Sequence, residues 1–378
     1  MKVDFDHVLR RVMARDGFLE YLSVYNDLPG VSEKIPLPSL PKLTPKVTRL
    51  PHDQVSMPHS DPSFIGVKAK PEKVPPLSEL LDQGYRLVEY DGNPHLFADS
   101  QERVHIAVLP FPREVVEAGL NEAFVDAVSE AQEHLDFSAS NATDIDDCNR
   151  GDFQTISTGI SHGGGQTEPR NLNHTRRNTD AIFKLSRSSA IRSIARWQSQ
   201  CYETWMPQLF SASKDVLQRL LKWKPSLAPN FTSSIFCSTT YNFGPSVVSD
   251  FHVDHLNWAT GICAITAGGT FDYRKGGHLV LKNHKLILEF PPCVTILIPS
   301  AMVTHGNLPI GPGESRISVT QYTAGGLFRW VDYGYKPASE YKARRIDAHL
   351  VPQEGETRWK KNVGLFSKLS DLPIELAS

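Results

Sequence analysis

The chain has 378 residues, and its hydrophobic and charged fractions of 40% and 22% are those of an ordinary globular protein. Lysine and arginine total 40 against 42 acidic residues, so the formal charge of −2 gives no general support to nucleic-acid binding, and a polyanion would need a local patch. The sequence has no apolar run long enough to cross a membrane and no secretory signal, so we expect a soluble, intracellular protein.

The N-terminal part predicts a helix followed by an extended arm. Residues 4–25 carry apolar side chains at helical spacing, interrupted at Gly17. From Pro29 to Pro76 prolines recur every few residues, which removes amide donors and excludes a central strand. We therefore predict residues 1–76 as a helix with a Pro-rich arm, and a separate folded domain over 77–378.

Residues 77–230 predict a small antiparallel β-meander, then helices and a polar connection. β-type runs at Tyr85–Tyr90 and Arg103–Leu109 flank turn signals. Residues 136–178 form a long connection rich in Asn, Ser and Gly, and loops of this length are often functional. Apolar residues at three- to four-residue spacing predict helices around 116–135, 179–187, 190–206 and 214–223.

A basic stretch lies between Pro169 and Ser199, where Asp180 is the one acidic residue. Such a stretch is either the patch that meets a polyanion or a solvated helix face. Its cations are Arg170, Arg176, Arg177, Lys184, Arg187, Arg192 and Arg196.

Residues 231–335 have an all-β texture, and residues 336–378 form a C-terminal extension. Seven or eight short runs rich in Ile, Val, Thr and Phe are separated by Gly and Pro, which predicts a jelly roll or a related barrel. The expected fold class is therefore α+β, with this core flanked by several helices. The candidate strands are 233–242, 247–254, 260–266, 278–281, 285–290, 294–298 and 315–323.

A metal-binding pattern lies in this β region. Side chains alternate along a strand, so His252 and Asp254 point the same way and can bind one ion. His305, which follows a strand and a turn, offers a third ligand. Two histidines and one carboxylate leave three positions open, the arrangement of non-haem iron(II) oxygenases, and those positions can take a 2-oxoacid and dioxygen. His59-Ser60-Asp61 has the same spacing, but it lies between prolines without a strand pattern, so we expect no metal there.

An arginine follows eleven residues after His305. Arg316 and Ser318 share one face of a β-branched strand, and a guanidinium with a nearby hydroxyl suits the distal carboxylate of 2-oxoglutarate. Each alone is also typical of an outward polar residue; together with the metal pattern they predict cosubstrate binding. Asn242 is a positional candidate for the proximal carboxylate. His278 and His284 are expected to be structural or surface residues.

Two motifs resemble the TET/JBP (ten-eleven translocation and base-J-binding-protein) family of DNA-base oxygenases, within it the fungal transposon-associated branch. His252-Val-Asp254-His-Leu-Asn257 resembles its H-x-D-x-x-N, and Arg316-Ile-Ser318-Val-Thr-Gln-Tyr322 resembles its R-I-S-x-x-x-Y. Similar stretches recur over Ser161–Leu172 and Gly325–Gly334, so the resemblance covers about Tyr85 to Tyr335. The chain lacks the cysteine-rich domain of animal members.

This resemblance implies a double-stranded β-helix that binds Fe(II), 2-oxoglutarate and O2 and oxidises a methylated base in double-stranded DNA. His252, Asp254 and His305 match the iron ligands, and Arg316 with Ser318 matches the cosubstrate clamp. Asn257 matches the residue that hydrogen-bonds the flipped base. We accordingly expect a nuclear protein, with 5-methylcytosine and N6-methyladenine both open as substrates.

A base inside a duplex must flip out to reach such a site, so the protein must also bind the DNA backbone. We predict backbone contacts from Arg170, Arg176 and Arg177. Asp332 is a candidate acceptor for the exocyclic amine of the base, and Trp330 a candidate stacking residue; a solvated aspartate and a core tryptophan are the alternatives. Two other functions remain open: a dioxygenase acting on RNA, protein or a small molecule, and an inactive jelly-roll binding module.

Overall fold

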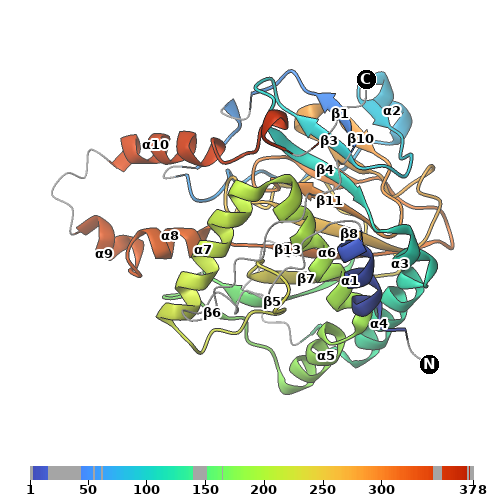
Figure 1. Ribbon diagram of the computed structural model, residues 1–378, viewed down its shortest axis with the longest axis horizontal. Coiled ribbons are helices and arrows are strands. Elements are labelled where there is room, and N and C mark those ends of the chain that lie inside the picture. The colour runs from blue at the N-terminus through green and yellow to red at the C-terminus, as the bar shows by residue number, and fades with distance from the viewer. Residues whose placement is uncertain are drawn as a thin grey trace.

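A computed structural model describes residues 3–15, 44–53, 56–60, 63–138, 151–163, 165–343, 351–372 and 374. These residues form two β-sheets with helices packed mainly against one of them (Figure 1). Within these ranges no helix has the length and apolar character needed to cross a bilayer.

The larger sheet has nine strands in the order β1-β3-β4-β11-β8-β13-β7-β5-β6. Neighbouring strands are antiparallel except β1 and β3, which are parallel. The strands are β1 (Lys46–Arg49), β3 (His95–Ala98), β4 (Val104–Pro110), β5 (Gln154–Ser161), β6 (Arg170–Asn171), β7 (Ser238–Phe243), β8 (Cys263–Thr270), β11 (Val294–Ile298) and β13 (Ser315–Tyr322).

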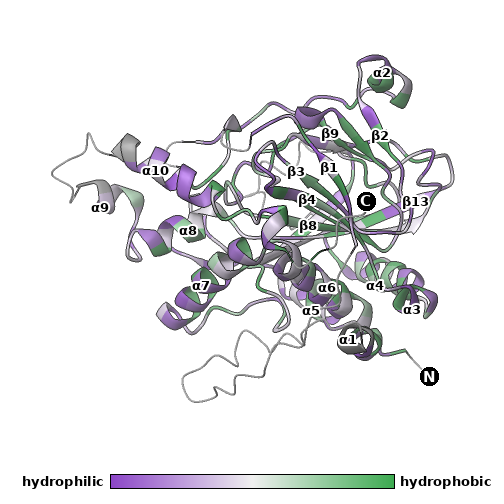
Figure 2. Cartoon of the chain, turned by 45° about the horizontal axis from the view of Figure 1, so that its top comes forward, coloured by the Kyte–Doolittle hydropathy of each residue, from purple (hydrophilic) through white to green (hydrophobic). Residues whose placement is uncertain are grey.

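The smaller sheet has the order β12-β9-β10-β2. Its strands are β2 (Arg86–Val88), β9 (Leu279–Leu281), β10 (Leu286–Leu288) and β12 (His305–Asn307). From β7 to β13 the chain passes repeatedly between the two sheets, as a jelly roll requires. The predicted α+β jelly-roll core is therefore confirmed, with open sheets rather than a closed barrel. Figure 2 shows hydrophobic strands at the centre and hydrophilic residues on the outward sides of the helices.

Helices α4 and α6 lie against β8 on the outer face of the larger sheet, and α1 packs on α6. Hydroxyl caps start two of the helices: Thr175 accepts from the amide of Asn178, and Ser188 from that of Ile191. The helices are α1 (Phe5–Arg15), α2 (Leu77–Asp82), α3 (Arg113–Glu117), α4 (Leu120–His134), α5 (Arg176–Ser186), α6 (Ser189–Trp205), α7 (Pro207–Trp223), α8 (Gly325–Asp332), α9 (Ala338–Ala343) and α10 (Val351–Val363), with short 3₁₀ turns at Lys282–His284 and Leu369–Asp371.

The structure differs from the sequence-based expectation at several places. Residues 247–254, expected as a strand, form only isolated bridges at Phe251 and His252. The expected meander is divided, because β2 pairs in parallel with the edge strand β10 while β3 and β4 join the larger sheet. The expected helix over 116–135 becomes α3 and α4, separated at Gly119, whose φ of 93° is left-handed. The long polar connection contains β5, which pairs along β7. Gly17 lies outside the described residues, and so does Gly164, the centre of the run Gly163-Gly164-Gly165 in that connection.

Candidate metal centre

Two backbone segments bring the predicted ligands together. The amide and carbonyl of His252 pair with those of His305 at 3.0 Å in both directions, so the two imidazoles start from neighbouring positions. The amide of Asp254 donates to the carbonyl of Ser300 at 3.0 Å, in the turn that precedes β12. The loop that carries His252 and Asp254 is thus tied to the segment that carries His305.

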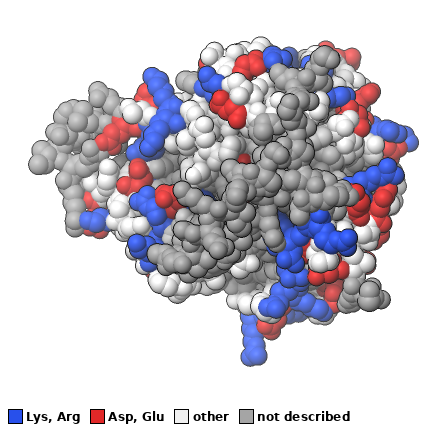
Figure 3. All heavy atoms as spheres, viewed as in Figure 1, with Lys and Arg blue, Asp and Glu red and all other residues white. Residues whose placement is uncertain are grey.

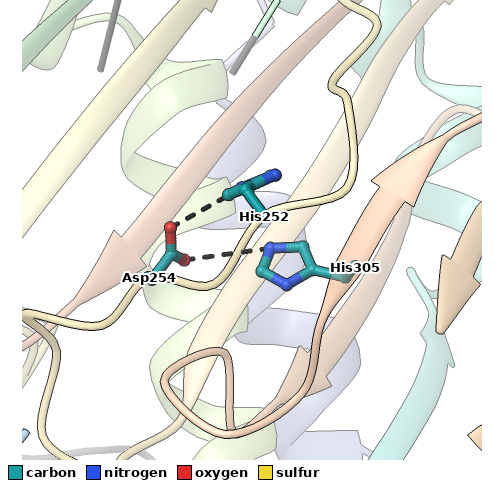
Figure 4. A group of neighbouring side chains, drawn as sticks. All are labelled: His252, Asp254 and His305. Carbon is teal, nitrogen blue, oxygen red and sulfur yellow. Dashed lines mark ion pairs between the residues drawn. The ribbon is translucent and has the colours of Figure 1, made fainter. Parts of the chain in front are cut away.

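The three side chains converge on one point, as Figure 4 shows. The Nε2 atoms of His252 and His305 lie 3.7 Å and 3.9 Å from the two carboxylate oxygens of Asp254. All three residues are buried, and one ligand atom from each lies within 4.8 Å of the others. Atoms bound about 2.1 Å from one ion at right angles would be about 3 Å apart, so these ligand atoms would have to approach one another by about 1 to 2 Å to share an ion.

The hydrogen bonds of the imidazoles suit metal binding. Nδ1 of His252 lies 2.8 Å from the carbonyl of Asp250, and Nδ1 of His305 lies 2.8 Å from the carbonyl of Val303. A carbonyl only accepts, so each Nδ1 carries a proton, which leaves Nε2, on the side of Asp254, as the nitrogen that can bind a metal. The donor set of two neutral imidazoles and a carboxylate fits Fe(II).

Arg316 lines one cavity together with His252, Asp254 and His305, here called the metal cavity, and its side chain is buried, with the residue 1% exposed. Its Nη1 donates to the carbonyl of Val247 at 2.7 Å, its Nε has no hydrogen-bond partner, and no carboxylate of the described residues forms an ion pair with it. Burial lowers the pKa of the guanidinium to about 10. A buried cation in this state is expensive unless an anion binds to it.

Ser318 and Asn242 lie beside Arg316 on the cavity side. They are register partners across β13 and β7, and Nδ2 of Asn242 donates to Oγ of Ser318 at 2.9 Å. Both line the metal cavity. The structure therefore brings together all six residues predicted from the sequence to hold metal or cosubstrate.

Strand β5 adds residues that the sequence analysis missed. Thr155 pairs with Asn242 across β7, and Ser157 pairs with Thr240, to which its hydroxyl is bonded at 2.7 Å. With Thr320, these side chains form a hydroxyl-rich wall on the inner face of the larger sheet; Thr155, Thr240 and Thr320 line the metal cavity. The alternation of Thr155, Ser157 and Gly159 with Ile156, Thr158 and Ile160 was the signal for this strand.

The predicted base contacts have different positions. Asn257 is buried, and its Nδ2 donates to Oγ of Ser300 at 3.1 Å. Trp330 is buried on α8, with its ring edge-on to Trp223. Asp332 pairs with Arg358 at 3.0 Å and lines a second cavity of about 540 Å³, beside α8. Neither Trp330 nor Asp332 lines the metal cavity.

The predicted basic patch is partly engaged in contacts with the protein. Arg170 on β6 and Arg176 at the start of α5 are exposed. Arg177 donates to the carbonyl of His134 at 2.7 Å, and Lys184 pairs with Glu130. Arg196 pairs with Asp6 at 2.7 Å. Figure 3 shows basic groups at the lower right, over α5 and α6, with acidic groups among them.

No other histidine among the residues that the structure describes joins the group of His252, Asp254 and His305. His59, of the second H-x-D sequence, stacks on Trp359, and Asp61 lies outside the described residues. His278 and His284 are buried, and burial lowers their pKa values to about 4 and about 3.

No family model matches the chain, and no curated protein matches it. Solved structures resemble it weakly. NgTET1 in complex with 5mC DNA is 16% identical with a TM-score of 0.36, over 66% of this chain and 88% of that one. The viral collagen prolyl hydroxylase vCPH from Paramecium Bursaria Chlorella virus-1, in its 2OG complex, is 14% identical with a TM-score of 0.19, over 23% and 57%. OsALKBH1 is 10% identical with a TM-score of 0.29, over 58% and 96%. These values establish neither a family nor an activity.

Proposed function

We propose that the chain is an Fe(II)- and 2-oxoglutarate-dependent dioxygenase. One observation carries the proposal: two imidazole Nε2 atoms and a carboxylate converge in a cavity whose wall holds a buried guanidinium that pairs with no carboxylate of the described residues. That combination suits a metal that must keep open positions and a cosubstrate with two carboxylates. A structural metal site would not need the arginine.

His252, Asp254 and His305 would hold the iron, and Arg316 with Ser318 would bind the distal carboxylate of 2-oxoglutarate. Asn242 would orient Ser318 through its hydrogen bond, and we retain it as the candidate for the proximal carboxylate. When bound, iron couples oxidative decarboxylation of 2-oxoglutarate by O2, giving succinate and carbon dioxide, to hydroxylation of a C–H bond.

For the substrate we propose the methyl group of a flipped base in methylated double-stranded DNA, with 5-methylcytosine and N6-methyladenine as the candidates. The motif resemblance suggests it, and the hydroxyl-rich wall of Thr155, Ser157 and Thr240 supports it, because a base presents hydrogen-bonding edges. The protein would then act in the nucleus. Contacts of the base with Asn257, Trp330 and Asp332 remain predictions.

The decisive experiment incubates the protein with Fe(II), 2-oxoglutarate and duplexes carrying different methylated bases, followed by measurement of succinate and mass spectrometry of nucleosides. We expect succinate and an oxidised or demethylated base in equal amounts. His305→Ala should lower both by about 100-fold or more, because it removes one ligand. His59→Ala is the matched control and should leave both unchanged. Succinate without a changed base would indicate another substrate class, and no succinate would favour the binding module.

The DNA proposal has its own test in salt dependence. Each phosphate contact that is lost lowers the slope of log affinity against log salt by about 1. We expect Arg170→Ala with Arg176→Ala to lower the slope for duplex binding by about 1 to 2. Arg177→Ala should change it less, because Arg177 already bonds to the carbonyl of His134. An unaltered slope in the double variant would remove the patch from the proposal.

A further inference from the structure

Residues 63–74, here called the strap, belong to the Pro-rich arm, to which the sequence assigns no chemistry. In the structure the strap runs along the segments that carry His252, Asp254 and His305, and it contacts the backbone next to each of them. Residues 251–258 contain no regular strand, so their position depends on such contacts.

Beside His252, the strap completes a backbone pairing. The amide of Phe251 donates to the carbonyl of Glu72 at 2.7 Å, and the amide of Glu72 donates back at 3.1 Å. His252 pairs with β12 through His305. The two-residue segment Phe251–His252 is therefore held on one side by the smaller sheet and on the other by the strap. Glu72 is in turn ion-paired to Lys282, directly after β9.

Beyond Asp254, the strap bonds to the chain twice more. The amide of Gly66 donates to the carbonyl of His255 at 2.8 Å, and the amide of Ala259 donates to the carbonyl of Phe64 at 3.1 Å. Asp254 thus lies between fixed backbone positions, with Ser300 on its other side.

The strap also touches the segment that leads to His305. A Cβ added to Gly66 would lie 2.0 Å from the carbonyl oxygen of Ala301, so the strap backbone packs directly on the turn before β12. A Cβ added to Gly306 would lie 2.6 Å from a methyl of Val74. Glycine at position 66 is needed for this close approach.

We propose that the strap positions the metal ligands, and that Gly66 is its main positioning residue. The inference rests on the proposed metal centre. Ligands must be held within about 0.5 Å to bind an ion well. Here the backbone beside all three ligands, two on a loop and one at the start of β12, contacts one common segment. The strap therefore sets metal affinity without supplying a ligand.

The test is Gly66→Ala, read out by titration with Co²⁺ under visible absorption. Alanine should force the strap from Ala301 and weaken Co²⁺ binding by about 10-fold or more. Gly163→Ala is the matched control, since its Cβ would meet no atom within 4 Å, and it should leave affinity unchanged. Leu209→Ala, a core change in α7, controls for lost stability; it should lower the melting temperature but leave Co²⁺ affinity within about twofold.

Wild-type protein provides a second measurement that does not depend on the variant folding. If strap and ligands are coupled, Co²⁺ must slow hydrogen exchange at the amides of Gly66, Glu72 and Phe251. The amide of Val104, bonded to Ser367, should not change. Unaltered Co²⁺ affinity in Gly66→Ala, or equal weakening by Leu209→Ala, overturns the strap proposal alone. Failure of wild-type protein to bind Co²⁺ overturns the metal centre together with it.

Discussion

Each face of β13 buries a polar side chain, but the two side chains differ in how far the protein satisfies their hydrogen bonds. Gln321 on the outward face is fully buried, and so is Arg316 on the inward face. Gln321 accepts from Ser234 at 2.8 Å and donates to Ala195 and Gln198 at 3.1 Å and 2.7 Å. The protein itself thus satisfies this amide, which fastens β13 to α6.

Among the described residues Arg316 has one such bond, to the carbonyl of Val247, and its Nε has no partner there. A protein loses stability by burying a polar group that it does not satisfy, and such groups are retained where a ligand completes them. Burial alone therefore does not separate structural from functional polar residues. What separates them is whether the protein supplies all the partners.

The sharpest test of this comparison is Arg316→Gln. We expect 2-oxoglutarate affinity to fall by about 100-fold or more, because two charge-assisted hydrogen bonds are lost. The melting temperature should stay the same or rise, since an unpaired buried cation is removed. Calorimetric titration of 2-oxoglutarate and thermal melts measure both. Arg316→Lys, which keeps the charge but not the fork, should bind with intermediate affinity. A lower melting temperature with unchanged affinity would make Arg316 structural.

For Gln321, on the outward face, we expect the opposite result: a loss of stability without a loss of 2-oxoglutarate affinity. Gln321→Leu should lower the free energy of unfolding by about 2 to 3 kcal/mol, because Ser234, Ala195 and Gln198 lose a buried partner. Affinity for 2-oxoglutarate should remain within about twofold. Chemical denaturation and the same titration test this. Comparable losses of affinity in Gln321→Leu and Arg316→Gln would erase the distinction between the two faces.

A smaller effect is expected at Ser318. Ser318→Ala removes one hydroxyl beside the guanidinium and should weaken 2-oxoglutarate binding by about 10- to 30-fold, the lower part of the range for one hydrogen bond to a charged group. Ser315→Ala changes the same side chain on the same strand, but Ser315 bonds to the amide of Thr270 outside the cavity. It should leave affinity unchanged, and the ratio of the two titrations gives the result. Equal affinities would remove Ser318 from the clamp.

The sequence predicted those features that depend on local periodicity. Alternation along a strand placed Arg316 and Ser318 on one face. Helical spacing located α5 and α6 within about three residues, whereas α7 begins at Pro207, well before the expected start at 214. The α+β jelly-roll core followed from the strand pattern. These predictions succeed because covalent geometry sets the periods of strands and helices wherever they form.

Other features depend on contacts between residues far apart in the chain. The pairing of β5 with β7 places Thr155 in the metal cavity. Asp332 pairs with Arg358 and lines the second cavity, beside α8. The strap reached the metal loop across nearly 190 residues, through bonds such as that of Gly66 to His255. Local sequence does not encode such neighbours, because backbone hydrogen bonds are chemically alike and only the packed core decides which segments meet.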